Sequence, residues 1–387
     1  MVIISPQLGM SPTATTGGET YDREVLGQFI KLGQDVRILL PKEKDIPSGV
    51  SGWKVDRTPV GHFAPPYTFN IFAFPWVVRQ LKQETPDVRQ ESPELVLRIH
   101  SPEYLFSTGY LVKKFFPKIP VIAHYHLDQT GRLWTAMNRK LLSTVDAVIA
   151  DSQYLKKQLV NRVGIAAEKI HVIHCGVDID TIKPKVYKGP TLPRQGRTLS
   201  DIKIILFLGR LIERKRPDLA IEIFAKLHAK HPDTKLIMVG EGPMEEKLKA
   251  QSSKLKVSEA IEFPGPLFGK EKLERYHEAD LFLFPSEKEG FVLVVLEAMA
   301  AGLPLLVPRA LGFGEAVEDG ENGFLAVSSD INDWVTKAEK ILFDEKINQA
   351  MRKRSRELAV RKFSWEECAK KNLEVYHQFH RYEFRAH

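Results

Sequence analysis

The chain has 387 residues, of which 43% are hydrophobic and 27% charged, proportions typical of a soluble globular protein with about two domains. Its formal net charge of +7 favours anionic partners such as nucleic acid, acidic lipid or phosphorylated small molecules, without choosing among them. No apolar run reaches the roughly 18 residues of a membrane span, residues 1–7 do not resemble a signal peptide, and the isolated Cys175 and Cys368 argue against disulfides and zinc clusters.

Short apolar runs alternate with amphipathic segments along the first half of the chain. The apolar, β-branched runs predict strands, and the stretches between them, such as residues 20–33 and 130–145, predict helices. We therefore expect strands at residues 2–5, 35–40, 94–100, 120–126, 147–152 and 170–176.

The pattern breaks at residues 183–201, where three prolines and two glycines indicate a linker. Alternation then resumes, with helices expected from Pro217 and around residues 270–279, and strands at 202–210, 235–242, 260–265, 280–286, 303–308 and 323–327. The expected domains are residues 1–185, a linker at 186–201, and residues 202–365. A last helix at 366–387 is expected to pack back on the first domain.

This alternation predicts an α/β protein with two Rossmann-like, doubly wound parallel-sheet domains. In open parallel sheets, ligands bind beyond the carboxyl ends of the strands, so we expect the site in an interdomain cleft. Four residues that follow predicted strands are candidates to line it: His126, Arg210, Gly240 and Glu289.

The stretch "SEKEGFVLVVLEAMAAGLP" (286–304) places two carboxylates around a predicted helix start. A helix beginning at Gly290 or Phe291 would direct free backbone N–H groups and its positive dipole end at a diphosphate. Glu289 could accept hydrogen bonds from two sugar hydroxyls, and Glu297, about two turns into the helix, from a ribose diol. The pair matches a nucleoside-diphosphate sugar, although a loop glutamate and a glutamate paired within the sheet would show the same spacing.

A second candidate element is "FLGRLIERKRPD" (207–218), where Gly209 ends a predicted strand. Arg210 and Lys215 offer two cations within one short loop, a planar fork and a mobile point charge for phosphate oxygens. Together they could neutralise a diphosphate leaving group. The alternative is an exposed basic loop, which is how we interpret the neighbouring Arg214 and Arg216.

These elements resemble the retaining glycosyltransferases of family four (glycosyl transferases group 1), whose fold is GT-B. The resemblance rests on "GRLIERK", "LIMVGEGP", the 286–304 stretch and "GEAVEDGENGFL" (314–325) in the second half. In the first half it rests on the glycine pair in "TATTGGETYDREVLGQFIKLGQDVRILL" (13–40), and on "VIAHYH" (121–126), "ADSQYLKKQL" (150–159) and "VIHCGVD" (172–178). Nearly the whole chain matches in order.

The resemblance implies a role for each matching residue. Glu289 would bind the donor sugar near its anomeric centre together with Gly290, Phe291 and His126, the last near the 6-hydroxyl. Glu297 would bind the ribose. The donor diphosphate would meet Arg210, Lys215, Gly18, Phe291, Val292 and Leu293. Gly17 and Gly18 would form a glycine-rich loop, and His126 and Glu289 would be the catalytic residues.

Three positions depart from the family pattern. Val292 stands where a small residue is common, Leu311 where a second glycine is common, and Arg216 where a glycine usually follows the loop lysine. His124 lies two residues before His126, and strand alternation would place both on one face. Because of these departures, the sequence does not identify the donor sugar.

The resemblance implies transfer of a hexosyl unit with retention, without a metal or other cofactor. No carboxylate nucleophile of the kind retaining hydrolases use can be assigned, so we expect same-face attack with the departing phosphate taking the acceptor proton. "DID" (178–180) imitates a metal-binding Asp-x-Asp but falls in the family's "GVD" position. Neither "GEGPME" (240–245) nor "GPLFGKEK" (265–272) completes a dinucleotide or P-loop motif.

The partners implied are a nucleotide-sugar donor and an acceptor that is a glycan, a glycolipid or a small molecule, with no nucleic acid. Segments 69–83 and 110–118 mix aromatic and basic residues, which fits either helices packed on the sheet or peripheral binding to an acidic membrane. We expect a cytoplasmic protein, and the sequence leaves open whether it also binds peripherally to the inner membrane surface. Two alternatives are a nucleotide-sugar epimerase or phosphorylase on the same fold and a non-catalytic sugar-binding protein.

Overall fold

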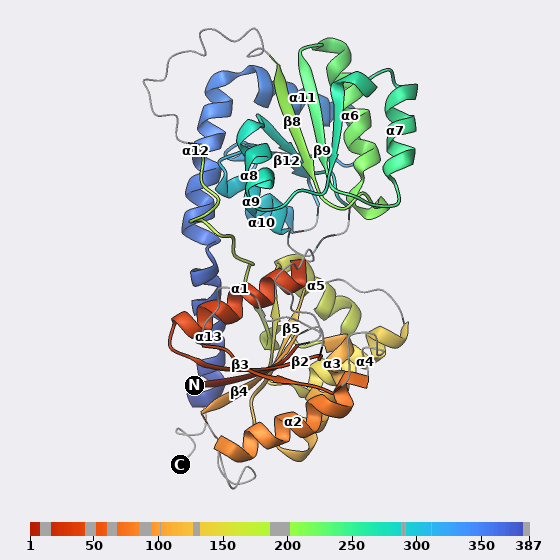
Figure 1. Ribbon diagram of the computed structural model, residues 1–387. Coiled ribbons are helices and arrows are strands. Elements are labelled where there is room, and N and C mark those ends of the chain that lie inside the picture. The colour runs from red at the N-terminus through yellow and green to blue at the C-terminus, as the bar shows by residue number, and fades with distance from the viewer. Residues whose placement is uncertain are drawn as a thin grey trace. The chain divides into compact units, whose positions relative to one another are not determined.

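The computed structural model of the chain describes residues 1–7, 17–42, 52–59, 68–84, 94–100, 102–126, 132–185, 202–287, 289, 292–310 and 312–381. The chain divides into two compact units, Met1–Gly176 with Trp365–His387, and Val177–Ser364 (Figure 1). The first unit thus ends at Gly176 rather than at residue 185, and the segment that returns to it begins at Trp365. The linker expected at 186–201 lies outside the described residues.

The first unit is built on a sheet of seven strands in the order β3-β2-β1-β4-β5-β6-β7. All neighbouring strands run parallel. The order reverses between β1 and β4, which are neighbours, and such a switch point is where ligands bind to doubly wound sheets. The strands are β1 (Val2–Pro6), β2 (Asp35–Leu40), β3 (Lys54–Arg57), β4 (Leu95–His100), β5 (Val121–Tyr125), β6 (Ala147–Ala150) and β7 (Ile170–Val172).

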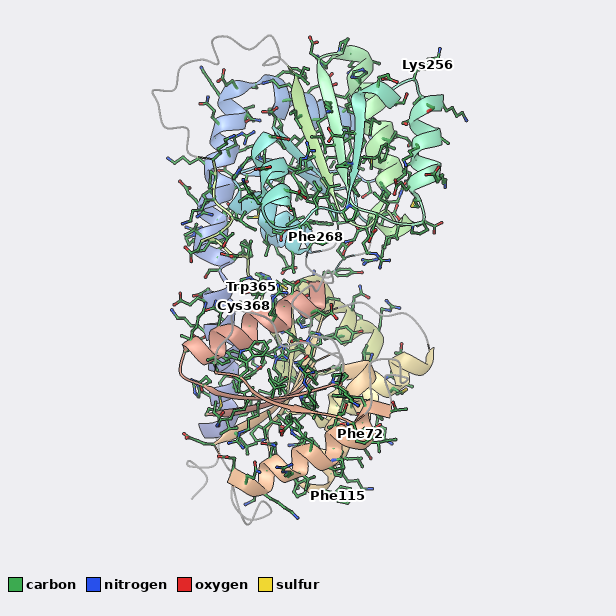
Figure 2. The ribbon with its side chains drawn as sticks, in the orientation of Figure 1. Phe72, Phe115, Lys256, Phe268, Trp365 and Cys368 are labelled. Atoms are coloured by element: carbon green, nitrogen blue, oxygen red, sulfur yellow. The ribbon has the colours of Figure 1, made fainter. Side chains whose placement is uncertain are left out.

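Helices cover both faces of this sheet. In Figure 1, α1 and α13 lie together on one face, and α2, α3 and α4 lie on the other. A Cβ on Gly176 would lie 2.5 Å from the Cα of Trp365, so only glycine lets α13 begin against this part of the chain. Trp365 and Cys368, marked in Figure 2, are buried. The helices are α1 (Gly17–Lys31), α2 (Phe69–Glu84), α3 (Pro102–Phe115), α4 (Arg132–Thr144), α5 (Gln153–Gln158) and α13 (Trp365–Arg381).

The second unit has a sheet of six parallel strands in the order β10-β9-β8-β11-β12-β13. Its order reverses between β8 and β11. The strands are β8 (Lys203–Leu208), β9 (Thr234–Val239), β10 (Ile261–Gly265), β11 (Leu281–Leu283), β12 (Leu305–Pro308) and β13 (Gly323–Ala326). The helices are α6 (Pro217–Lys230), α7 (Glu245–Lys254), α8 (Gly269–Glu278), α9 (Leu293–Ala300), α10 (Phe313–Ala316), α11 (Ile331–Phe343) and α12 (Glu345–Lys362).

Two glycines let the connections after β8 and β9 run in contact. A Cβ on Gly240 would lie 2.0 Å from the carbonyl oxygen of Gly209, and one on Gly242 would lie 2.4 Å from that of Leu211. Gly240 also has a φ of 138°, which residues other than glycine rarely adopt. The close approach is locked by the bond from the Leu211 N–H to the Glu241 carbonyl. This contact holds the loop after β8, which carries Arg210, in place at the switch point of the sheet.

The two parallel sheets confirm the predicted fold class. One strand was not predicted, β3, because Lys54–Arg57 is a charged and largely exposed edge segment without an apolar run. "DID" forms a turn in which Oδ1 of Asp178 accepts from the backbone N–H of Asp180 and Thr181. That turn supports the structural interpretation of the motif.

The aromatic and basic segments at 69–83 and 110–118 fall within helices α2 and α3 and the turn after α3. Phe69 and Trp76 are buried, whereas Ile71 is 67% exposed and Phe115 is 49% exposed. Figure 2 marks Phe72 and Phe115 on these two helices. Within the described ranges, no helix combines the length and the apolar character that crossing a bilayer demands. Peripheral membrane association stays a prediction.

Candidate active site

Glu289 lies in the loop that follows strand β11. Its side chain is 10% exposed, and the Lys215 ammonium lies 2.5 Å from its Oε1. The Ser286 hydroxyl donates to the same oxygen at 2.6 Å. Because an unpaired buried carboxylate is costly, these two groups hold the charge in place. Strands β8 and β11 are neighbours at the switch point, so Glu289 and Lys215 lie where a parallel sheet binds ligands.

Lys215 closes a single 3₁₀ turn, Glu213–Lys215, after strand β8. Its ammonium lies 5.0 Å from the centre of the Phe284 ring, and its side chain is 12% exposed. Burial lowers the pKa of Lys215, Glu289 opposes that shift, and the nearby Arg214 and Arg210 add to it. Lys215 and Arg214 both contact Glu289, and Arg210 lies close enough to act on Lys215, so positive charge gathers here and favours an anionic ligand.

Arg214 is part of this site. Its interpretation from the sequence as a residue of an exposed basic loop missed its contact with Glu289. Its guanidinium lies 3.2 Å from both carboxylate oxygens of Glu289. Arg210 is exposed, and within the described part of the chain no ion pair forms on it. Arg210 is therefore the cation of this loop whose charge is available to a ligand without breaking a bridge.

Glu297 is held by two side chains of helix α8. The Lys272 ammonium lies 2.8 Å from its Oε1, and the Tyr276 hydroxyl donates to Oε2 at 2.8 Å. Tyr276 is 1% exposed, and burial, reinforced by Glu297, raises the pKa of its hydroxyl well above the usual value. That hydroxyl therefore keeps its proton and remains a donor, which fixes the direction of the Glu297 carboxylate.

Helix α9 begins later than predicted. Its first residue is Leu293 and its N-cap is Val292, whose side chain makes no capping bond. Glu297 is consequently the fifth residue of the helix, a little more than one turn in, and not two turns in. Gly290 and Phe291 lie outside the described residues. The backbone N–H groups of the first turn at Leu293 lack acceptors within the helix, as at any helix start.

Three histidines lie close together in the first unit. His124, within β5, is fully buried, with Nε2 2.8 Å from the Tyr376 hydroxyl and Nδ1 3.4 Å from that of Tyr21. Burial lowers the pKa of His124 well below its usual value. His126, just after β5, is 14% exposed, and its Nε2 has no hydrogen-bond partner among the described residues. His124 therefore has a structural environment, whereas His126 has a nitrogen available to a ligand.

His100, the last residue of β4, belongs to a buried charged group. Its Nδ1 lies 3.0 Å from Asp22, which also pairs with the fully buried Arg98. His100 Nε2 lies 3.4 Å from the place that a Cβ on Gly18 would occupy. Gly17 and Gly18 are the first two residues of helix α1 and not a loop before it, which corrects the prediction for them.

Sequence reasoning missed several residues that the structure joins to the predicted ones. Asp151, directly after β6, lies 3.2 Å from His126, and its position after a strand was a usable signal. Tyr276 and Lys272 could not be found this way, because they lie on a helix face whose partner depends on packing. The residues added are Asp22, Asp151, Arg214, Lys272 and Tyr276.

Comparison with known proteins adds independent evidence. A family model described as Glycosyltransferase Family 4 matches residues 15–181, and one described as Glycosyl transferases group 1 matches residues 190–358. The glycogen synthase of Mycobacterium tuberculosis is 29% identical over 289 residues, which are 72% of this chain and 68% of that protein. A GDP-mannose-dependent mannosyltransferase acting on phosphatidylinositol monomannoside, from Mycolicibacterium smegmatis, is 30% identical over 63% of this chain and 66% of its own length.

Solved structures share the fold along almost the whole chain. HepE of Anabaena, in complex with UDP and glucose, matches with a TM-score of 0.73 at 19% identity over 98% of this chain and 100% of that one. Sucrose-phosphate synthase of Thermosynechococcus elongatus matches with a TM-score of 0.76 at 21% identity over 97% and 98%. The two units therefore form a GT-B fold.

The fold and the family models agree on one class of protein, the GT-B glycosyltransferases. Within that class the chain belongs to glycosyltransferase family four, glycosyl transferases group 1. This confirms the resemblance noted from the sequence, and with it that the protein is an enzyme that transfers a glycosyl group.

Proposed function

We propose that this glycosyltransferase moves a hexosyl unit from a nucleoside-diphosphate sugar to a hydroxyl acceptor with retention of anomeric configuration and without a metal ion. The observation that carries the proposal is the pairing of buried Glu289 with Lys215, in a loop that also carries the exposed Arg210; helix α9 of the same unit adds Glu297. This arrangement offers cations for a diphosphate and carboxylates for a sugar and a ribose. HepE, a protein of the same fold, is described in complex with UDP and glucose.

In the proposed reaction, the bond from the anomeric carbon to the diphosphate oxygen breaks and a bond to the acceptor oxygen forms on the same face. The departing phosphate oxygen takes the acceptor's proton, and the nucleoside diphosphate leaves. Negative charge grows on that oxygen as the bond breaks, so Lys215 and Arg210 would stabilise the transition state more than the ground state. Glu289 would orient the sugar hydroxyls, and the first-turn amides of α9 would face the diphosphate.

The remaining assignments of the proposal are the roles of Glu297, His126 and the first unit. Tyr276 and Lys272 leave Glu297 in one orientation, which suits a pair of ribose hydroxyls as donors. His126 would meet the donor sugar. The first unit would bind the acceptor, which is a glycan, a glycolipid or a small molecule; the exposed Ile71 and Phe115 are the surface at which a lipid acceptor would be met.

The deciding experiment combines a donor screen with product analysis. Thermal shifts with UDP-, GDP- and ADP-sugars would identify the donor, and acceptors would then be screened with it. A product whose anomeric proton coupling matches that of the donor supports retention, whereas an inverted product contradicts it. Turnover that is lost in EDTA and restored by Mg²⁺ or Mn²⁺ would contradict metal independence.

A further inference from the structure

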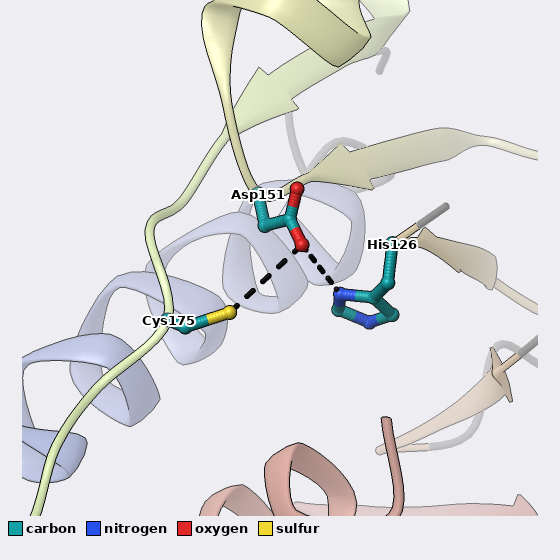
Figure 3. A group of neighbouring side chains, drawn as sticks. All are labelled: His126, Asp151 and Cys175. Atoms are coloured by element: carbon teal, nitrogen blue, oxygen red, sulfur yellow. Dashed lines mark hydrogen bonds and ion pairs between the residues drawn. The ribbon is translucent and has the colours of Figure 1, made fainter. Parts of the chain in front are cut away.

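Asp151 connects two residues that no sequence motif pairs. It follows strand β6 directly, and its side chain is 3% exposed. Its Oδ2 lies 3.2 Å from Nδ1 of His126, which follows β5, and 3.9 Å from Sγ of Cys175, which lies beyond β7. Figure 3 shows the Asp151 carboxylate between the imidazole ring and the thiol.

The hydrogen-bonding capacity of these groups determines where the proton of His126 lies. Burial and the charge of Asp151 raise the pKa of the Cys175 thiol well above its usual value, so the thiol keeps its proton and donates to Oδ2. Because Oδ2 belongs to an ionised carboxylate, it has no hydrogen to donate and can only accept from His126. Nδ1 must therefore carry the hydrogen of this bond. In the neutral ring, Nε2 is then an acceptor with a free lone pair.

The surroundings keep the ring neutral and in place. Burial lowers the pKa of His126, and the hydrogen bond to Asp151 offsets only part of that shift. The Tyr21 ring lies 4.2 Å from the His126 ring, centre to centre, and the His100 ring 4.9 Å. The titratable and charged groups that face His126 come from α1, β4, β5 and the ends of β6 and β7: Tyr21, Asp22, His100, His124, Asp151 and Cys175.

We propose that Asp151 is a positioning residue, which holds His126 in the Nδ1–H tautomer so that Nε2 accepts a hydrogen bond from a hydroxyl of the substrate. Nε2 is a buried atom without a partner among the described residues, and an unsatisfied buried acceptor is costly, which favours a donor supplied by a ligand. A sugar with a hydroxyl at this position is bound, and one with a carboxylate there is disfavoured by the lone pair. The nature of the ligand rests on the proposed function, whereas the tautomer does not.

The same three residues could also bind a zinc ion, since their ligand atoms lie within 4.8 Å of one another. The structure favours the hydrogen-bonded arrangement, because the thiol would have to lose its proton beside a carboxylate before it could bind a metal. The two arrangements make different predictions. Co²⁺ added to the full chain should give no thiolate-to-metal absorption band. A stoichiometric band that disappears in Cys175→Ser would overturn the proposal.

The direct test is the tautomer itself. The full chain, labelled with ¹⁵N histidine, should show the His126 ring as the Nδ1–H tautomer near neutral pH, with the signal assigned by its loss in His126→Gln. An Nε2–H tautomer or a charged ring in the unmutated protein would overturn the proposal, and this measurement needs no activity. In Asp151→Asn we expect a shift toward the other tautomer; an unchanged spectrum would also contradict the proposal.

Kinetics then separate positioning from a merely structural role. Asp151→Asn should lower kcat about 10- to 100-fold with little change in the KM for the nucleotide sugar. Because Asp151 raises the pKa of His126, its removal should move the acid limb of the pH–rate profile to lower pH. Cys175→Ala should change kcat less than threefold or so, like the matched buried-thiol control Cys368→Ala. Two outcomes would show that the role of Asp151 is merely structural. One is a loss of activity in Asp151→Asn that appears only as a raised KM, and the other is an acid limb that does not move.

A modified donor tests the hydroxyl. Resemblance to the family places His126 near the 6-hydroxyl, so the 6-deoxy form of the best donor should react about 10-fold or more slowly with the unmutated protein. The same change should matter little in Asp151→Asn. Equal losses in both proteins would overturn the proposal. If no nucleotide sugar is a substrate at all, the proposed function fails while the tautomer measurement still decides the role of Asp151.

Discussion

The ammonium of Lys215 lies 2.5 Å from Oε1 of Glu289, and both side chains are almost buried. One follows β8 and the other β11, which are neighbours where the strand order of the second sheet reverses. Removing this buried cation would leave the Glu289 carboxylate with only the more exposed Arg214 as counter-charge. The pair is thus a preformed charged group, ready for a ligand that brings both phosphate oxygens and hydroxyls.

Glu289→Gln should lower kcat about 100-fold or more, because an amide cannot orient the sugar hydroxyls as a carboxylate does. Affinity for the nucleoside diphosphate should not weaken, because Lys215 loses its anionic partner and its charge becomes fully available. Calorimetric titration and turnover of the same preparation check both parts. Glu246→Gln, at an exposed position of helix α7, is the control, and normal turnover by Glu289→Gln would contradict the assignment.

Arg210→Ala should weaken binding of the nucleoside diphosphate by about 10-fold, since a charge-assisted hydrogen bond is lost. Lys215→Ala should weaken it similarly and also destabilise the unit, because Glu289 is left buried without its ammonium. The two losses should shrink as ionic strength rises. Lys247→Ala, on the exposed face of α7, should bind normally. An unaltered dissociation constant in Arg210→Ala would rule out its phosphate contact.

Glu297→Ala should abolish the preference for ribose over 2′-deoxyribose. In the unmutated protein, loss of one hydroxyl from the diol should cost about 1 kcal/mol or more in binding. Tyr276→Phe removes the 2.8 Å hydrogen bond to Glu297 and a longer one, of 3.4 Å, to the Val294 carbonyl oxygen, and it should reduce the preference partly. Titration of each protein with paired ribo- and deoxyribonucleotides measures the effect. Equal discrimination by all three proteins would remove Glu297 from the ribose site.

Stability in acid should depend on the buried Asp22–Arg98 pair. Burial alone would raise the pKa of Asp22, but Arg98 and His100 lower it from 3.8 to about 2. Since the pKa is depressed in the folded state, the pair contributes about 2 kcal/mol above pH 3.8 that is lost as the pH falls through about 2. Denaturant unfolding between pH 5 and pH 2 should show this decline.

In Asp22→Asn that pH dependence should flatten. Stability near pH 7 should drop by about 3–5 kcal/mol, because Arg98 is left buried without a counter-charge. The double variant Asp22→Asn/Arg98→Met should recover part of the loss. A slope that is unchanged in Asp22→Asn would show that other carboxyls carry the acid sensitivity.

Arg216 occupies a backbone position that suits glycine, with a φ of 51°. Its ion pairs with Asp218 and Glu287 are partly exposed and contribute little. Arg216→Gly should therefore be more stable than Arg216→Ala by about 1 kcal/mol, because both lose the pairs and only alanine keeps the left-handed strain. Thermal or denaturant unfolding of the two variants measures the difference. Equal stabilities would show that the loop relaxes when Arg216 is replaced.

Most of the fold could be predicted from the sequence because its strands are buried on both faces. Segments such as Ala147–Ala150 and Lys203–Leu208 are nearly continuous apolar runs, and each is followed by a helical pattern. Strand β3 could not be predicted, because an edge strand with charged residues carries no such run. Helix α9 starts at Leu293, later than the sequence predicted. The start was hard to predict because Val292 makes no side-chain capping bond and the preceding residues carry no start signal.

The sequence by itself determined the two α/β units and the strand ends at which Arg210, Lys215, Glu289 and His126 lie, since local periodicity fixes where strands end and ligands bind beyond those ends. Only the tertiary structure decided which side chains meet. The contacts of Arg214 with Glu289 and of Asp151 with His126 join segments brought together by strand order. Strand order and register depend on packing across the whole sheet, and no local pattern in the chain records them.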